Sequence, residues 1–173
     1  MVRIDGDPSV WHLLPAPLAA ELGWTIASFG HLEDMLKRAI FALDRDRLSG
    51  GIREREFRDW LRRMDHVAAD SLGTLIERLE RTLAREGRSD RELMADLDEI
   101  KTWRNLLCHA AWREAEGTAG GWQPVFANTR GEVYDGVIAA SDLAAIRAMT
   151  LDAAARARRL IEALDDHGNG VSD

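Results

Sequence analysis

Apolar residues recur every three or four positions along most of this chain, and this spacing predicts long helices. The first helical segment runs from Pro17 to about Leu43, and Pro17 suits the first turn of a helix. Its expected core positions are Leu18, Leu22, Ile26, Phe29, Leu36 and Ile40. The breaker cluster Ser49-Gly50-Gly51 is expected to end this helix.

A second helical pattern covers Ile52 to Glu86. It forms either one helix or two, with Asp65 or Asp70 as an N-cap inside the segment. Gly87 is expected to end it, because glycine adopts the left-handed backbone conformation that commonly follows a helix.

The third pattern begins near Asp90 and leads into the stretch Trp103–Trp112. Ser89 or Asp90 can supply its N-cap, since either side chain accepts a hydrogen bond from the first helical turn. Its apolar stripe consists of Leu93, Leu97, Ile100 and Leu107. This regular stripe predicts a helix with one face against the core.

The pattern changes after Trp112. The segments Gln123–Asn128 and Glu132–Ile138 are typical of short strands, and Thr129-Arg130-Gly131 between them is typical of a hairpin loop. A final helix is expected from a cap at Ser141 to about Leu164.

Together these elements predict a mainly α fold, an up-and-down helical bundle of four to five helices with a small β-hairpin inserted before the last helix. Residues 1–173 are long enough for one hydrophobic core, so we expect a single domain. Within it, the hairpin occupies about 121–139 and a flexible tail about 167–173.

Composition limits the function classes. The net charge of −7 argues against broad non-specific nucleic-acid binding, so we expect no DNA partner and only a local contact with RNA. The single cysteine excludes an intramolecular disulfide and a cysteine-based zinc site, which favours a cytoplasmic protein. No apolar run is long enough for a membrane span, and the histidines lack metal-ligand spacing. We therefore expect no membrane, metal or cofactor.

Two charged residues interrupt the apolar stripes. Arg104 lies at about +40° from Ile100 on a helical wheel, within the stripe of its helix. Glu33 lies at the same angle from Phe29 on the first helix. Because an unpaired buried charge is costly, we expect Glu33 and Arg104 to meet, directly or through water.

A second group of polar residues lies close to Arg104. Lys101, Asn105 and His109 are four positions apart and share a polar face of the same helix. His109 either has a chemical function or is stabilised by the dipole at the C-terminal end of the helix. Cys108 is expected to be a small buried apolar residue.

The motif Arg104-Asn105-x-x-x-His109, at the end of the penultimate long helix, resembles the HEPN superfamily. The signature of that family is an arginine separated from a histidine by four to six residues, commonly with a polar residue directly after the arginine. The resemblance covers the order of helices from about Pro17 to Leu164, and its specific part is six positions. Ala111 stands where some members have a tyrosine.

The resemblance implies a homodimer with two motifs facing one cleft and, in active members, a metal-independent endoribonuclease of the toxin or phage-defence type. His109 would exchange protons with the ribose 2′-OH and the leaving 5′-oxygen, and Arg104 would stabilise the phosphate charge. Asn105 would hold the imidazole or a phosphate oxygen. Glu33 and Lys101 are the supporting residues of this hypothesis. An antitoxin or another protein is an expected partner.

A second interpretation stays open. The chain is then a catalytically inactive HEPN-like dimeric scaffold or a module that binds a nucleotide or another ligand. Arg104 and Glu33 would in that case satisfy each other within the bundle.

Overall fold

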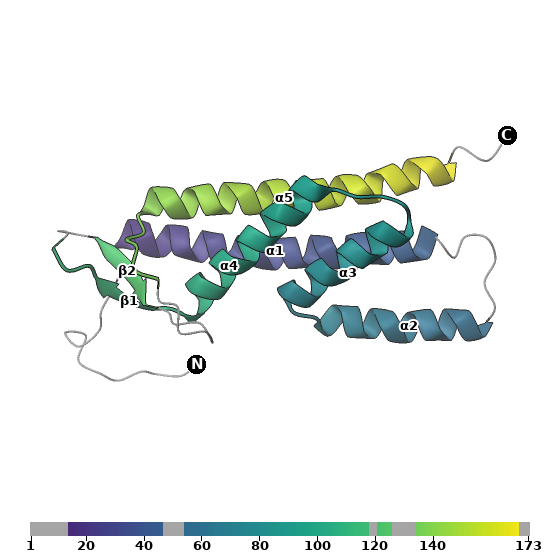
Figure 1. The fold of residues 1–173 in the computed structure, drawn as a ribbon, viewed down its shortest axis with the longest axis horizontal. Coiled ribbons are helices and arrows are strands. Elements are labelled where there is room, and N and C mark those ends of the chain that lie inside the picture. The colour runs from purple at the N-terminus through teal and green to yellow at the C-terminus, as the bar shows by residue number, and fades with distance from the viewer. Residues whose placement is uncertain (1–13, 47–53, 118–120, 126–133, 170–173) are drawn as a thin grey trace.

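The structure is a computed structural model that describes residues 14–46, 54–117, 121–125 and 134–169. Five helices and one two-stranded sheet are present in these ranges (Figure 1). In chain order they are α1 (Ala16–Asp46), α2 (Glu54–Ala69), α3 (Leu72–Arg85), α4 (Arg91–His109), β1 (Ala111–Glu114), β2 (Trp122–Val125) and α5 (Ala140–Asn169). None of the described helices combines the length and apolar character that a membrane span requires.

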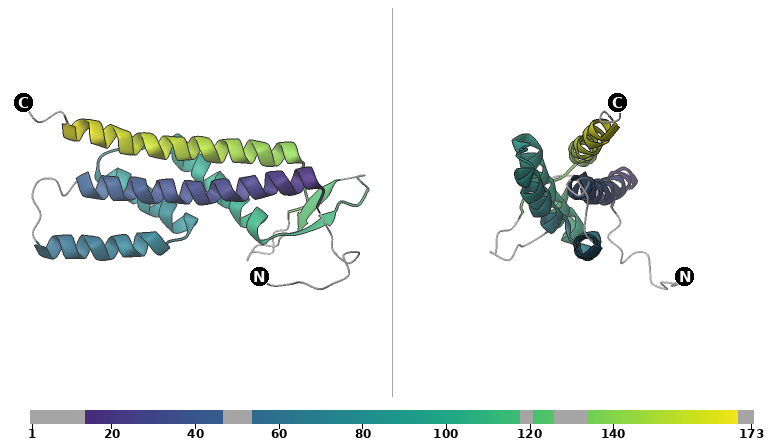
Figure 2. Two further views of the ribbon diagram at one scale, coloured as in Figure 1. Left: turned by 180° about the vertical axis from the view of Figure 1, so that it is seen from behind. Right: turned by 90° about the vertical axis from the view of Figure 1, so that its right-hand side faces the viewer.

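The two long helices α1 and α5 lie side by side and run in the same direction (Figures 1 and 2). Helices α3 and α4 cover one side of this pair, and α2 lies beside the C-terminal half of α1. Successive helices alternate in direction, so the expected up-and-down bundle with a small hairpin before the last helix is confirmed.

The core follows the predicted apolar stripes. All four stripe residues of α4 are buried, with Leu97 and Ile100 fully inaccessible to solvent. Full burial of one such side chain contributes about 1.5–3 kcal/mol to the free energy of unfolding. One expected core position of α1 is wrong, because Ile26 lies at the edge of the stripe and is 40% exposed. Leu32, which was not among the expected core positions, is completely buried.

Local hydrogen bonds set the helix ends. The segment from Ile52 to Glu86 forms two helices, and Ser71 rather than Asp65 or Asp70 caps the second of them. Gly87 follows α3 with a φ of 66°, as expected for a residue that ends a helix. Asp90 caps α4, since its Oδ1 accepts a hydrogen bond from Leu93 N at 2.9 Å.

The hairpin is present, but its bounds differ from the prediction. Strand β1 pairs antiparallel with β2, with Trp112 opposite Pro124. The sheet therefore begins directly after α4 and extends over 111–125 rather than 121–139. Of the expected second strand, Ile138 forms only an isolated bridge to Trp122, and the predicted loop at 129–131 lies outside the described residues.

The last helix starts earlier and ends later than expected. The carboxylate of Asp142 accepts a hydrogen bond from Ala139 N at 2.8 Å, so the helix is capped around Ala139 rather than by the side chain of Ser141. Helix α5 continues to Asn169, through the first part of the expected flexible tail, and residues 170–173 lie outside the described ranges.

Candidate functional site

The candidate site is the C-terminal end of α4, which carries the whole Arg-Asn-x-x-x-His motif. Helix α4 ends at His109 because Ala110 is extended, with φ −72° and ψ 141°. The N–H of Ala110 still donates to the carbonyl oxygen of Leu106 at 2.9 Å. The chain then enters β1, so the motif lies between the bundle and the hairpin.

Arg104 meets Glu33, as expected from the two interrupted stripes. Its Nη2 lies 3.9 Å from Oε1 of Glu33, and the two side chains are 31% and 24% exposed. Its Nη1 also donates to Oδ1 of Asn105 at 3.5 Å. Both distances are long for their kind, and a guanidinium has five N–H donors. The guanidinium therefore faces Glu33 and Asn105 through long contacts and keeps donors for another anion.

His109 is exposed at the last position of α4. Asn105, one turn earlier on the same side of the helix, is exposed as well. The structure thus combines a half-buried guanidinium, an adjacent carboxamide and an imidazole that solvent reaches.

Two expectations about neighbouring residues need correction. Cys108 is exposed, not buried, because the apolar stripe of α4 passes through Leu107. Lys101 belongs to a different set of contacts from Arg104. Its ammonium pairs with Asp98 at 2.7 Å, and its side chain lies beside Gly73 of α3. The structure therefore brings together Arg104, Asn105 and Glu33, and its described contacts do not join Lys101 to them.

Of the motif residues, Arg104 is half-buried, and Asn105 and His109 are exposed. Cavities of about 920, 450 and 210 Å³ occur elsewhere, and none of the three is lined by Arg104, Asn105 or His109. In the part of the chain that the structure describes, no group of three or more His, Cys, Asp or Glu side chains could hold a metal ion. None of these three cavities therefore encloses the motif.

Comparisons with family models, curated proteins and solved structures find no match to this chain. The resemblance to the HEPN superfamily therefore rests on the motif residues and the order of the helices. Any assignment of function has to be argued from the geometry of the site.

The structure also brings together two aromatic residues whose contact was not predicted from the sequence. Trp103, next to Arg104 in the chain, contacts Tyr134 edge to face, with ring centroids 6.1 Å apart. Both residues line the cavity of about 450 Å³ between α4 and α5, together with Asp142. Trp103 and Tyr134 are far apart in the sequence, and no local pattern indicates that they meet.

We expect Tyr134 to ionise above its ordinary range. Partial burial raises the pKa of its phenol above 10.0, and the negative charges of Asp142 and Asp135 raise it further. Folding therefore favours the protonated phenol of Tyr134. The stabilisation that this phenol contributes is complete below pH 10 and is lost as pH rises through the folded-state pKa. Because Tyr134 is the only tyrosine, tyrosinate absorbance during an alkaline titration reports on it alone. A midpoint at or below pH 10 would contradict this expectation.

Proposed function

We propose that this protein is a metal-independent endoribonuclease whose chemistry is carried by the C-terminal end of α4. One observation carries the proposal: the half-buried Arg104 guanidinium, which faces Glu33 and Asn105, lies on the same helix end as the exposed His109. A cation and an accessible base at one helix end are two groups that RNA transesterification uses.

The proposed reaction uses the ribose 2′-OH as the nucleophile. His109 removes its proton, the 2′-oxygen forms a bond to phosphorus, and the bond from phosphorus to the 5′-oxygen breaks. A protonated imidazole donates a proton to the departing 5′-oxygen. The products are a 2′,3′-cyclic phosphate and a 5′-hydroxyl. Arg104 stabilises the negative charge that develops on the phosphate oxygens, because its planar donor array suits them.

The proposed active form is a homodimer. A second copy would bring a second His109 into the same cleft, so that one imidazole acts as base and the other as acid in one turnover. The surface of α1 next to the motif supports this arrangement. Ile26 is seven positions before Glu33, so it lies on the same face of α1, and it is 40% exposed. An added Cβ on Gly30, between them, would meet nothing within 4 Å.

The proposed setting is that of a cytoplasmic toxin or phage-defence nuclease. The net charge of −7 restricts contact with RNA to a small region around the motif. An antitoxin would act by covering this region or by keeping two copies apart.

The same contacts favour a second candidate function. The pair of Glu33 and Arg104 satisfies two charges inside the bundle, as expected for a structural role. The chain would then be an inactive dimeric scaffold, or a module in which Arg104 binds the phosphate of a nucleotide.

The test is incubation of the purified full chain with single-stranded RNA in the presence of a chelator. We expect cleavage, with 2′,3′-cyclic phosphate and 5′-hydroxyl ends on the products. A matched substrate with 2′-deoxyribose at the cleaved position should remain intact, because it lacks the nucleophile. Cleavage that stops with chelator, or that leaves a 5′-phosphate, would contradict the proposed chemistry. Intact RNA with measurable nucleotide binding would favour the second candidate.

A further inference from the structure

Helices α1, α2 and α3 together form a cavity that is lined by four arginines, here called the arginine cavity. Its volume is about 210 Å³. Arg63 comes from α2, and Arg78, Arg81 and Arg85 come from α3. The three arginines of α3 are three and four positions apart, so they form one row along the same face of that helix.

The arginine cavity carries an excess of positive charge. Among the described residues that line it, Asp44 is the single carboxylate against four guanidinium groups. The chain as a whole has a net charge of −7, so this concentration of arginine does not follow from the overall composition. Like charges at close quarters repel each other, and an anion bound among them removes that cost.

Two of the four arginines are anchored within the protein. Arg78 Nε donates to the carboxylate of Asp70. Arg85 Nη2 lies 3.0 Å from Oδ1 of Asp44 and 3.0 Å from Oγ1 of Thr82, and Thr82 is buried. Both hydrogen bonds of Arg85 use Nη2, so the fork of its guanidinium is fixed at the cavity while Nη1 and Nε keep their donors.

The other two arginines have no carboxylate partner in the part of the chain that the structure describes. Arg81 Nε donates only to the carbonyl oxygen of Glu77, at 3.1 Å. No hydrogen bond or ion pair joins Arg63 to another described residue, and both side chains are exposed. Two unpaired guanidinium groups from different helices therefore line one small cavity.

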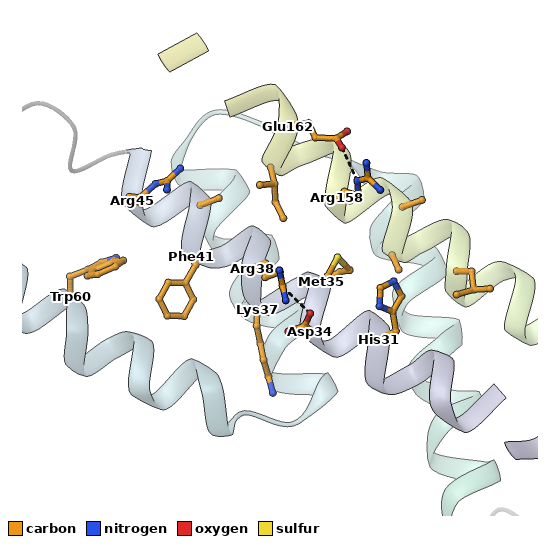
Figure 3. A pocket seen from close by; sticks show the side chains of 15 residues that line it. His31, Asp34, Met35, Lys37, Arg38, Phe41, Arg45, Trp60, Arg158 and Glu162 are labelled. Carbon is orange, nitrogen blue, oxygen red and sulfur yellow. Dashed lines mark hydrogen bonds and ion pairs between the residues drawn. The ribbon is translucent and has the colours of Figure 1, made fainter. Parts of the chain in front are cut away.

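The size and lining of the arginine cavity do not suit a large organic ligand. Ile40 and Val67 are its apolar residues among those described, and pockets that enclose drug-sized molecules exceed about 300 Å³. The cavity of about 920 Å³ differs, because aromatic side chains such as Phe41 and Trp60 line it (Figure 3). The arginine cavity therefore favours a compact anion with several charges.

We propose that the arginine cavity binds a compact oligophosphate, a ligand with two or more consecutive phosphate groups. A guanidinium presents its N–H donors in a plane, which matches the oxygens of a phosphate group. Arg63 and Arg81 bind oxygens of neighbouring phosphate groups, and the anchored Arg85 donates to them from the wall of the cavity. A ligand with several negative charges is needed to balance the excess of positive charge. This inference does not depend on the proposed nuclease activity.

The test is calorimetric titration of the full chain with pyrophosphate, at constant ionic strength and without divalent cations. We expect saturable binding of one pyrophosphate per chain. Orthophosphate, which offers a single phosphate group, should bind at least about tenfold more weakly. Equal affinity for the two anions, or no saturable binding of pyrophosphate, would overturn the inference.

Three variants locate the binding site. Arg63→Gln and Arg81→Gln each remove one unpaired guanidinium, and each should weaken pyrophosphate binding at least about fivefold. Arg62→Gln is the matched control, because Arg62 is next to Arg63, pairs with Asp59 on the surface and does not line the cavity. It should change the affinity less than about twofold. The same affinity in all three variants would overturn the inference.

Thermal unfolding separates a binding role of Arg81 from a structural one. Pyrophosphate at about one hundred times its dissociation constant should raise the unfolding midpoint of the wild type by roughly 5–10 °C. Without pyrophosphate, Arg81→Gln should unfold within about 1 °C of the wild type or above it, because the variant loses like-charge repulsion and no ion pair. A clearly lower midpoint for this variant without ligand would show that Arg81 stabilises the fold, and the inference would fail.

Nucleotides and RNA separate the possible sources of the phosphate groups. ADP should bind at least about tenfold more tightly than AMP if the oligophosphate is part of a nucleotide, and binding of pyrophosphate without ADP would support an inorganic oligophosphate. Single-stranded RNA with 2′-O-methyl riboses, which cannot be cleaved by attack of the 2′-oxygen, serves as the competing ligand. If Arg63→Gln and Arg81→Gln weaken binding of this RNA and leave pyrophosphate binding unchanged, the cavity contacts an RNA backbone and the inference is wrong.

Discussion

Replacement of His109 by alanine is expected to lower the rate of RNA cleavage by roughly 10²- to 10⁴-fold, the range for loss of a general acid–base group. The side chain is exposed at the last position of α4 and is not part of the core. The variant should therefore keep the thermal unfolding midpoint of the wild type within about 1–2 °C. The measurement is the initial rate of cleavage of a labelled single-stranded RNA in chelator.

A matched control is His66→Ala, which removes another exposed histidine near the end of a helix, on α2. It should leave the cleavage rate unchanged. Arg104→Lys tests the second functional group, because lysine keeps the charge but loses the planar donor array. It should reduce the rate by at least about tenfold. Equal activity of His109→Ala and His66→Ala would remove His109 from the chemistry.

Replacement of Arg156 by alanine is expected to cause a large loss of stability, of about 2 kcal/mol. The side chain is 16% exposed and joins α5 to the beginning of α4. Its guanidinium lies 2.8 Å from Asp90 and 2.8 Å from Asp96, with Glu92 at 3.5 Å. Asp90 is also the N-cap of α4. Loss of the guanidinium leaves two partly buried carboxylates without this partner and loosens the helix that carries the motif.

For a chain of this length, that loss corresponds to a decrease of about 4–8 °C in the thermal unfolding midpoint. Arg158→Ala is the matched control, two positions along the same helix. Its guanidinium pairs with Glu162 at 2.7 Å, but the arginine side chain is 71% exposed. Loss of such a surface pair should cost less than about 0.5 kcal/mol. Similar midpoints for the two variants would show that the Arg156 contacts do not stabilise the fold.

The helices were predictable because their signal is local. A fully apolar stripe such as Leu93, Leu97 and Ile100 requires a helix with one buried face, and the structure buries all three residues completely. The contact between Glu33 and Arg104 was predictable for a related reason. Two opposite charges that interrupt two core stripes have few ways to avoid the cost of burial other than pairing.

Strand pairing was less predictable because its signal is not local. The sequence favours pairing of 123–128 with 132–138, which are separated by a loop containing glycine. The structure instead pairs β2 with β1, since α4 ends at His109 and delivers the next residues in an extended conformation beside Trp122. The composition of the turn alone does not reveal that residues 111–114 compete with residues 132–138 as the pairing partner of β2.

Tertiary contacts between residues far apart in the sequence were not predictable. Trp60 meets Phe41 only because α2 folds back along α1, and Trp103 meets Tyr134 only because the segment after the hairpin returns to α4. The cavity of about 920 Å³ likewise exists because α1 and α5 run side by side. None of these contacts has a signature at a fixed spacing in the sequence.

The central proposal is that two copies of the α4 end form one RNA-cleaving site. The most direct measurement compares the cleavage rate with the oligomeric state over a range of protein concentrations in chelator. We predict that the rate per chain falls when the protein is diluted below the dissociation constant for dimerisation, in parallel with the loss of dimer mass in light scattering. A constant rate per chain in a monomeric protein, or RNA left intact by a stable dimer, would contradict the proposal.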